Sequence, residues 1–126
     1  IGRLPQGYVQ NEAETGAWAR AVEAGQLATA KGHALTEGDR LYGAIIEALM
    51  CYGRADLNAI GAAHGVAPEW VEEALRDAQV FLPDGLTHCN DGQMSLADGA
   101  EIFVRLVASA FDQHMHRSNA RHSVAV

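Results

Sequence analysis

The sequence predicts a mainly α-helical fold with one small β-hairpin, and three observations support this. Residues 36–57 place Leu41, Ile45 and Leu49 at the i, i+4 and i+8 positions of one helical face. Two later segments, residues 68–81 and 97–116, also show a helical spacing of apolar residues. Between them, the turn signal Asn90-Asp91-Gly92 separates two short strand-like runs. With 126 residues, 48% of them hydrophobic, the chain has the size of one ordinary domain with a real core.

The first third of the chain carries the weakest pattern. Residues 1–11 contain scattered glycine and proline and no helical period, which predicts loop or short extended chain. A helix is expected from Asn11 or Thr15 to about Ala24, because Gly25 follows as a stop signal. We expect the segment 26–35 to be a connector.

The central helix follows Thr36, a helix-capping residue type, with Asp39 three positions later as in a capping box. Gly53 marks its end. Its broad apolar face predicts a helix of about four turns that is buried on most sides. Asp56 is then placed to cap a short helix that stops at Gly65.

Three further elements complete the prediction. A helix begins at Pro68, a residue suited to a first helical turn, and runs to Phe81. The hairpin pairs Leu86–Cys89 with Gln93–Leu96. A last helix is expected from Ala97 or Asp98 to about His116. Its predicted apolar face consists of Ile102, Phe103, Leu106, Val107, Ala110 and Phe111.

The order helix, short helix, helix, hairpin, helix is that of a winged-helix-like domain, which we place at residues 36–116. Residues 1–35 are expected to form an arm or the end of a preceding domain, and residues 117–126 a tail. The chain starts at Ile1-Gly2 without a start methionine or signal peptide, so we expect it to be part of a longer protein.

The charge distribution argues against nucleic acid as a partner. The net charge is −7, and residues 67–101 alone hold eight acidic residues against the single base Arg76. In winged-helix domains the third helix usually enters the DNA groove, yet here that helix is acidic, and phosphates would repel it. The chain is therefore expected to use its fold for packing. No apolar run approaches the roughly 18 residues of a membrane span.

Cys51 and Cys89 are the only cysteines. One lies in the apolar central helix and the other in a predicted strand, so we expect two buried free thiols in a reducing compartment. A disulfide between them is not implied. Because no Cys-x-x-Cys cluster is present, the chain is not expected to hold an iron–sulfur cluster or a cysteine-ligated zinc ion.

Isolated histidines and acids favour ordinary surface roles. His114 and His116, at i and i+2 on a helix, point in different directions and do not chelate a metal together. We expect both, with His122, to be solvated. His64 lies at a helix end, where the helix dipole favours a cation. His33 and His88 have no partner visible in the sequence, and Glu69 and Glu73 are expected on a solvated helix face.

An ordered set of short segments resembles the C-terminal region of oxygen-independent coproporphyrinogen III oxidases. Each segment alone is weak, but together they span nearly the whole chain in the family's order. They are Gly7–Asn11, Trp18–Gly25, Gly32–Leu35 ahead of Asp39-Arg40, Leu49–Cys51, Asp84–Leu86, Phe111-Asp112 and Arg121–Ser123. Gln113 and His114 depart from the family pattern, where an aromatic residue often follows Phe-Asp.

The resemblance implies a radical S-adenosylmethionine enzyme of haem synthesis. The family oxidatively decarboxylates two propionates of coproporphyrinogen III to give protoporphyrinogen IX in the cytoplasm. A 4Fe-4S cluster held by a Cys-x3-Cys-x2-Cys motif cleaves S-adenosylmethionine to a radical. The resemblance places the catalytic barrel and those cysteines upstream of Ile1, so the implied partners of this chain are that barrel and the porphyrinogen.

One cofactor contact carries over by resemblance. In the family a Ser-x-Ile-Gly-like turn touches S-adenosylmethionine, and Ile1-Gly2 is similar to its second half, which implies Ile1 as a contact. The alternative is an isoleucine that only packs. Arg117 and Arg121 are further candidates to meet substrate carboxylates, on charge complementarity alone. A related haem-chaperone branch and an unrelated helical interaction module remain alternatives, although Gly7–Asn11 and Leu49–Cys51 look more like the oxidase branch.

Overall fold

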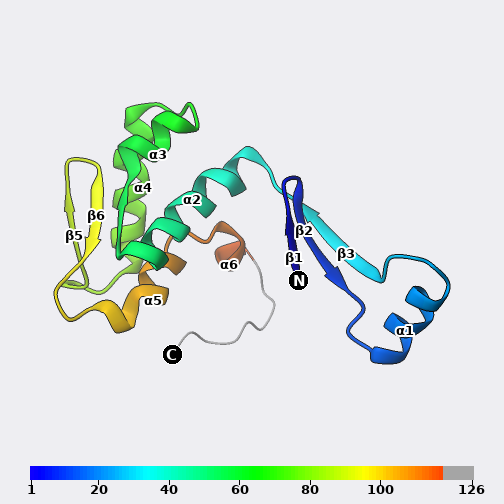
Figure 1. Cartoon of the computed structure of the whole chain (residues 1–126). Coiled ribbons are helices and arrows are strands. Elements are labelled where there is room, and N and C mark those ends of the chain that lie inside the picture. Colours follow the sequence, from blue (N-terminus) through cyan, green and yellow to red (C-terminus); the bar gives the residue numbers. More distant parts are fainter. Residues whose placement is uncertain (118–126) are drawn as a thin grey trace. The chain divides into compact units, whose positions relative to one another are not determined.

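A computed structural model describes residues 1–117 of the chain (Figure 1). The chain divides into two units, residues 1–36 and the residues from Glu37 onward. Each unit contains a three-stranded antiparallel sheet, together with one helix in the first unit and several in the second. The mainly helical prediction with a hairpin is therefore confirmed for the second unit, while the sheet of the first unit was not predicted.

The first unit consists of β1 (Gly2–Leu4), β2 (Gly7–Asn11), α1 (Thr15–Glu23) and β3 (Thr29–Ala34). Its strands are ordered β1-β2-β3. The expected connector over residues 26–35 is wrong, because most of it is β3. Its sequence lacks a strong apolar alternation, and the strand forms because its backbone pairs with β2, whose residues lie 18 to 27 positions earlier in the chain.

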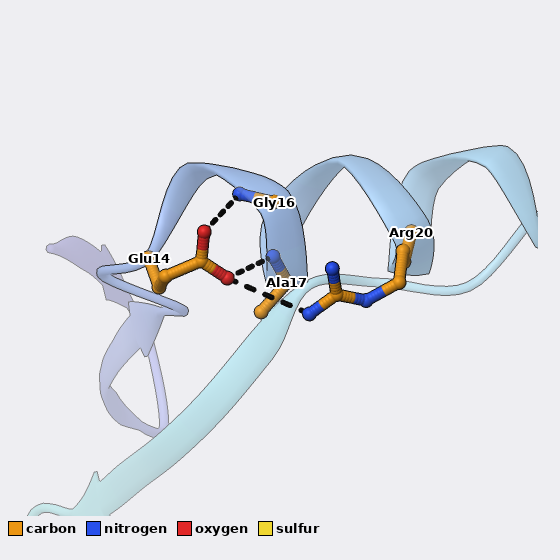
Figure 2. A network of polar contacts seen from close by, with 4 residues as sticks. All are labelled: Glu14, Gly16, Ala17 and Arg20. Atoms are coloured by element: carbon orange, nitrogen blue, oxygen red, sulfur yellow. Dashed lines mark hydrogen bonds and ion pairs between the residues drawn. The ribbon is translucent and has the colours of Figure 1, made fainter.

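Helix α1 begins at Thr15, one of the two predicted starts, and its cap is Glu14 (Figure 2). The Glu14 carboxylate accepts hydrogen bonds from the backbone N–H groups of Gly16 and Ala17, both at 2.6 Å. It also lies 3.5 Å from the guanidinium of Arg20. A glutamate thus satisfies the free N–H groups of the first turn, the role expected of shorter side chains such as Asn or Thr.

The second unit begins with a helix, a strand and two helices. These are α2 (Glu37–Tyr52), β4 (Arg54–Asp56), α3 (Leu57–Ala63) and α4 (Pro68–Phe81). The hairpin strands β5 (Thr87–Asn90) and β6 (Gln93–Leu96) follow. The unit closes with the 3-10 turn η1 (Glu101–Phe103), α5 (Val104–Ser109) and α6 (Gln113–Arg117).

The expectation that helix α2 is buried on most sides is wrong, because the helix has a single buried face. Leu41, Ile45 and Leu49 lie in the core, whereas Met50 is 45% exposed. The core side chains of α2 meet those of the other helices and of the sheet. The buried cluster comprises Ile45, Leu49, Ala55, Leu57, Val71, Ala74, Ala78, Leu82, Met94, Val107, Ala108 and Phe111.

The predicted hairpin is confirmed and gains a third strand. The turn residues Asp91 and Gly92 have φ angles of 46° and 74°, the left-handed pair that a tight two-residue hairpin turn requires. The unpredicted strand β4 pairs with β6, giving the order β4-β6-β5. With only three residues, β4 shows no readable alternation, so only its pairing with β6 defines it as a strand.

Two hydrogen bonds connect the hairpin turn to the start of α3. The backbone N–H of Leu57 donates to the carbonyl oxygen of Gly92 at 2.9 Å, and the side-chain amide of Asn58 donates to the carbonyl oxygen of Asp91 at 2.9 Å. Asp56 caps α3 as predicted, because its Oδ1 accepts from the N–H of Ala59 at 2.9 Å. These contacts fix the sheet against α3.

The expected single last helix is wrong, because η1, α5 and α6 divide it. Asp112 interrupts it, since its Oδ1 accepts from the N–H groups of His114 and Met115 and so starts a new helix. Val107 and Phe111 are buried as predicted, but Ile102 is 82% exposed. Among the described helices, none is long and apolar enough to cross a membrane.

Candidate functional site

The outer face of the sheet β4-β6-β5 carries charged, hydroxyl, amide and imidazole side chains. The strand register places Arg54 opposite Ser95 and Ser95 opposite His88. These three residues therefore form one row across three neighbouring strands. The next row on the same face consists of Asp56, Gln93 and Asn90.

The direction of these rows follows from the alternation of side chains along a strand. The intervening row, Ala55, Met94 and Cys89, faces the other way, and both Ala55 and Met94 are buried in the core. The side chains of Arg54, His88 and their neighbours therefore face away from the core. The sheet has one apolar and one polar face, as is common for antiparallel sheets.

This polar face is part of an open groove of about 890 Å³. Ala48 and Tyr52 of α2 and Ala59 and Ile60 of α3 also line the groove. Tyr52 is 76% exposed, so most of its surface is available to a bound molecule. The groove thus combines a polar floor with partly apolar walls, and it is more polar than most small-molecule sites, which are predominantly apolar.

The charged groups Asp56 and Arg54 of the groove differ in their hydrogen bonds. The Asp56 carboxylate accepts the capping hydrogen bond of α3 at Oδ1 and a hydrogen bond from Gln93 Nε2 at Oδ2, at 3.3 Å. The guanidinium of Arg54 has no hydrogen bond or ion pair with any residue in the described part of the chain, 1–117. Arg54 is therefore a cation with its donors available to a ligand.

Of this surface, only His88 was singled out in the sequence, as a histidine without a visible partner. The alternation in the predicted hairpin could have indicated the outward direction of His88, Gln93 and Ser95. Arg54 was missed because it lies on the unpredicted strand β4. Tyr52 was missed because tyrosine is intermediate between buried and exposed residue types, so its position at the end of an apolar helix indicates neither.

The histidine predictions have mixed outcomes. His114 is not simply solvated, because its Nε2 lies 2.6 Å from Oδ1 of Asp39. That partner is 75 positions away in the sequence, so spacing alone gave no sign of it. His64 lies at the C-terminal end of α3, as predicted. The side chain of His116 and the whole of His122 lie outside the described residues.

The cysteine prediction is wrong for Cys51 and partly right for Cys89. Cys51 is exposed, because it lies two positions after Leu49 and so on the outer side of α2. Cys89 is half-buried, next to the core on β5. Both are free thiols. The acidic residues of α4, in contrast, are exposed as predicted, Glu69 and Glu73 included.

Ile1, the candidate contact for S-adenosylmethionine, is 93% exposed and directly precedes β1. Its role stays a prediction, because nothing else in the first unit identifies a cofactor site. The side chain of Arg117 and all of Arg121 lie outside the described residues, so their proposed contacts with substrate carboxylates also stay predictions.

Comparison with known proteins gives a consistent result. No family model matches the chain. All 126 residues align at 44% identity with the oxygen-independent coproporphyrinogen III oxidase of Bradyrhizobium diazoefficiens, covering 28% of that protein. The chain is a relative of the oxygen-independent coproporphyrinogen III oxidases. The resemblance noted in the sequence is thereby confirmed.

Further oxidases of this group are similar to the chain over nearly the same share of their length. The enzyme of Cereibacter sphaeroides strain ATCC 17025 is 35% identical over 125 residues, which is 27% of its length. The solved structure of coproporphyrinogen III oxidase from Escherichia coli, described as a radical SAM enzyme, matches 88% of this chain with a TM-score of 0.77 and 22% identity. The chain spans about a quarter of the length of each of these oxidases, and the solved structure supports its fold.

Proposed function

We propose that this chain is the C-terminal part of an oxygen-independent coproporphyrinogen III oxidase of the cytoplasm. The parent protein would convert coproporphyrinogen III to protoporphyrinogen IX by oxidative decarboxylation of two propionates. The observation that carries this proposal is the match of the whole chain, at 44% identity, to only 28% of a named oxidase. A match confined to one region fits a domain that accompanies a separate catalytic domain.

Such an enzyme uses a 4Fe-4S cluster and S-adenosylmethionine. This chain does not offer the cysteine ligands that the cluster needs. The chain has two cysteines, one on α2 and one on β5, and a three-cysteine motif is absent from its sequence. The cluster and the radical chemistry that it supplies with S-adenosylmethionine therefore belong to a barrel domain outside this chain. The isolated chain is expected to be inactive.

For residues 36–116 we propose a winged-helix-like domain. Two features support it: the chain order helix, strand, helix, helix, hairpin, and the strand order β4-β6-β5. The helix α4 would occupy the position of a recognition helix, and it presents exposed acids such as Glu69 and Glu73. Phosphates would be repelled there, so the domain would serve packing and not nucleic-acid binding.

Residues 1–35 would belong to the preceding domain as an arm. Unit 1 has little core of its own: Leu4, Trp18, Val22 and Leu27 are all exposed. A unit of this size rarely folds without external support. The exposed apolar side chains fit contact with the barrel of the parent protein, and Ile1 at its start would contact S-adenosylmethionine.

The role proposed for the domain is to cover the porphyrinogen site of the barrel. The test is made on the full-length parent protein, purified anaerobically, with and without the region from Glu37 onward. We expect the truncated protein to keep its iron–sulfur absorbance but to lose most of its S-adenosylmethionine-dependent conversion of coproporphyrinogen III. Unchanged conversion would exclude the covering role.

Assays of the intact parent protein distinguish the oxidase branch from the haem-chaperone branch. Decarboxylation with an iron–sulfur absorbance supports the oxidase. A cluster without decarboxylation, together with a sharp absorbance band on haem titration, would instead indicate the haem-chaperone branch. A parent protein without a cluster would contradict the proposed function altogether.

A further inference from the structure

We propose that the groove on the outer face of β4, β6 and β5 binds the oxyanion of a small ligand, a carboxylate or a phosphate monoester, through Arg54, Ser95 and His88. This inference rests on the geometry of the sheet and does not depend on the reaction of the parent protein. Its first support is the register, which places the three residues in one row.

The row has the arrangement that an oxyanion requires. Neighbouring strands lie roughly 5 Å apart, so the short hydroxyl of Ser95 on the middle strand has a longer side chain on each side. Arg54 supplies a planar guanidinium with several N–H donors, and His88 supplies a ring nitrogen. An oxyanion above Ser95 lies between these groups, and arginine binds carboxylate and phosphate oxygens in a paired geometry.

The state of these donors is the second support. The Arg54 guanidinium has no polar partner in residues 1–117, and the nearest acid along β4, Asp56, is already occupied by the N–H of Ala59 and the amide of Gln93. Asp56 therefore forms no ion pair with the Arg54 guanidinium. A free cation next to an engaged carboxylate indicates a place for an external anion.

The electrostatics also limit the size of the ligand. Asp56 and Asp91 make the turn end of the groove acidic, and the whole chain carries a net charge of −7. A polyanion such as nucleic acid would be repelled along most of its length. A single oxyanion at the Arg54 row avoids that repulsion. Because the exposed ring of Tyr52 lines the same groove, a planar group attached to the oxyanion has a surface on which to stack.

The test uses the ¹⁵N-labelled chain of residues 1–126 and three probes at constant ionic strength: benzoate, phenyl phosphate and benzyl alcohol. The two anions separate a carboxylate from a phosphate ligand, and the alcohol has a ring without charge. We expect saturable amide shifts centred on residues 54, 88 and 95 with at least one anion. Shifts of equal size with benzyl alcohol, or no saturable shift with either anion, would overturn the proposal.

Two substitutions test whether the anion binds at the row of Arg54, Ser95 and His88. Arg54→Gln is expected to weaken binding of the better anion about fivefold, the scale of a partly exposed ion pair. Ser95→Ala should weaken it as well. The matched control is Arg105→Gln, which removes an exposed cation on α5 that does not line the groove, and should leave the dissociation constant unchanged. Equal affinity for the wild type and Arg54→Gln, with both spectra showing a folded chain, would contradict the proposal.

Discussion

The imidazole Nε2 of His114 lies 2.6 Å from Oδ1 of Asp39, joining α6 at the end of the described chain to the first turn of α2. The Asp39 side chain is largely buried, whereas most of the His114 side chain is exposed. Asp112 holds the start of α6 at the same time by capping it. The last described helix is therefore fixed both at its own cap and to the helix that begins the second unit.

Replacing His114 with alanine should loosen α6 without unfolding the second unit. The loss of one partly exposed hydrogen bond is expected to lower the free energy of unfolding by about 0.5–1 kcal/mol. Hydrogen exchange should become faster in residues 113–117 and stay unchanged in the core of α2. The control is His88→Ala, an exposed histidine on β5, which should alter neither quantity. Unchanged exchange in α6 would show that the contact with Asp39 does not hold this helix.

Gly92→Ala should be clearly destabilising, because Gly92 has a φ of 74° and an added Cβ would collide with the side-chain amide of Asn58. The conformational strain alone costs about 1 kcal/mol, and the collision adds to it. Gly99→Ala separates the two causes, since Gly99 has a φ of 81° but open space around its missing Cβ.

Urea unfolding of the two glycine variants provides the measurement. Gly92→Ala should lower the midpoint more than Gly99→Ala. Adding Asn58→Ala to Gly92→Ala should cost less than the sum of the two single effects, because the collision is removed. Equal losses for both glycines would mean that the turn does not press against α3 as described.

Leu49 and Met50 test the single buried face of α2. Leu49 is fully buried, so Leu49→Ala should cost about 2–5 kcal/mol through lost apolar contacts and a cavity. Its neighbour Met50 is nearly half exposed, so Met50→Ala should change the stability by less than about 1 kcal/mol. Thermal unfolding by circular dichroism measures both. Similar losses at the two positions would restore the expectation that α2 is buried on most sides.

The two cysteines should differ in reactivity. Cys51 is exposed and Cys89 half-buried, so a thiol reagent such as Ellman's reagent should modify Cys51 first and Cys89 more slowly in the folded chain. Cys51→Ser should remove the fast phase, and Cys89→Ser the slow one. Two equally fast phases, or none before denaturation, would contradict the exposures seen here.

Local signals in the sequence were sufficient to predict most of the helices and the hairpin of the second unit. The capping of α3 by Asp56, the first turn of α4 at Pro68 and the hairpin turn at Asp91-Gly92 each depend on a few neighbouring residues, and all three are confirmed. The break in the last helix was missed because the cap at Asp112 directly follows an apolar spacing that runs up to Phe111 and favours one helix. Nothing within the segment shows which of the two prevails.

By itself, the sequence determined the chain's relationship to the oxidases, the helical character of the second unit, and the acidity of α4. These features reside in residue identity and short-range spacing. Tertiary structure alone decided the strands β3 and β4, the contact of His114 with Asp39, and the row of Arg54, Ser95 and His88. Each joins residues that are far apart in the chain. Strand pairing and side-chain contacts of that kind become favourable only once the rest of the fold has brought the partners together.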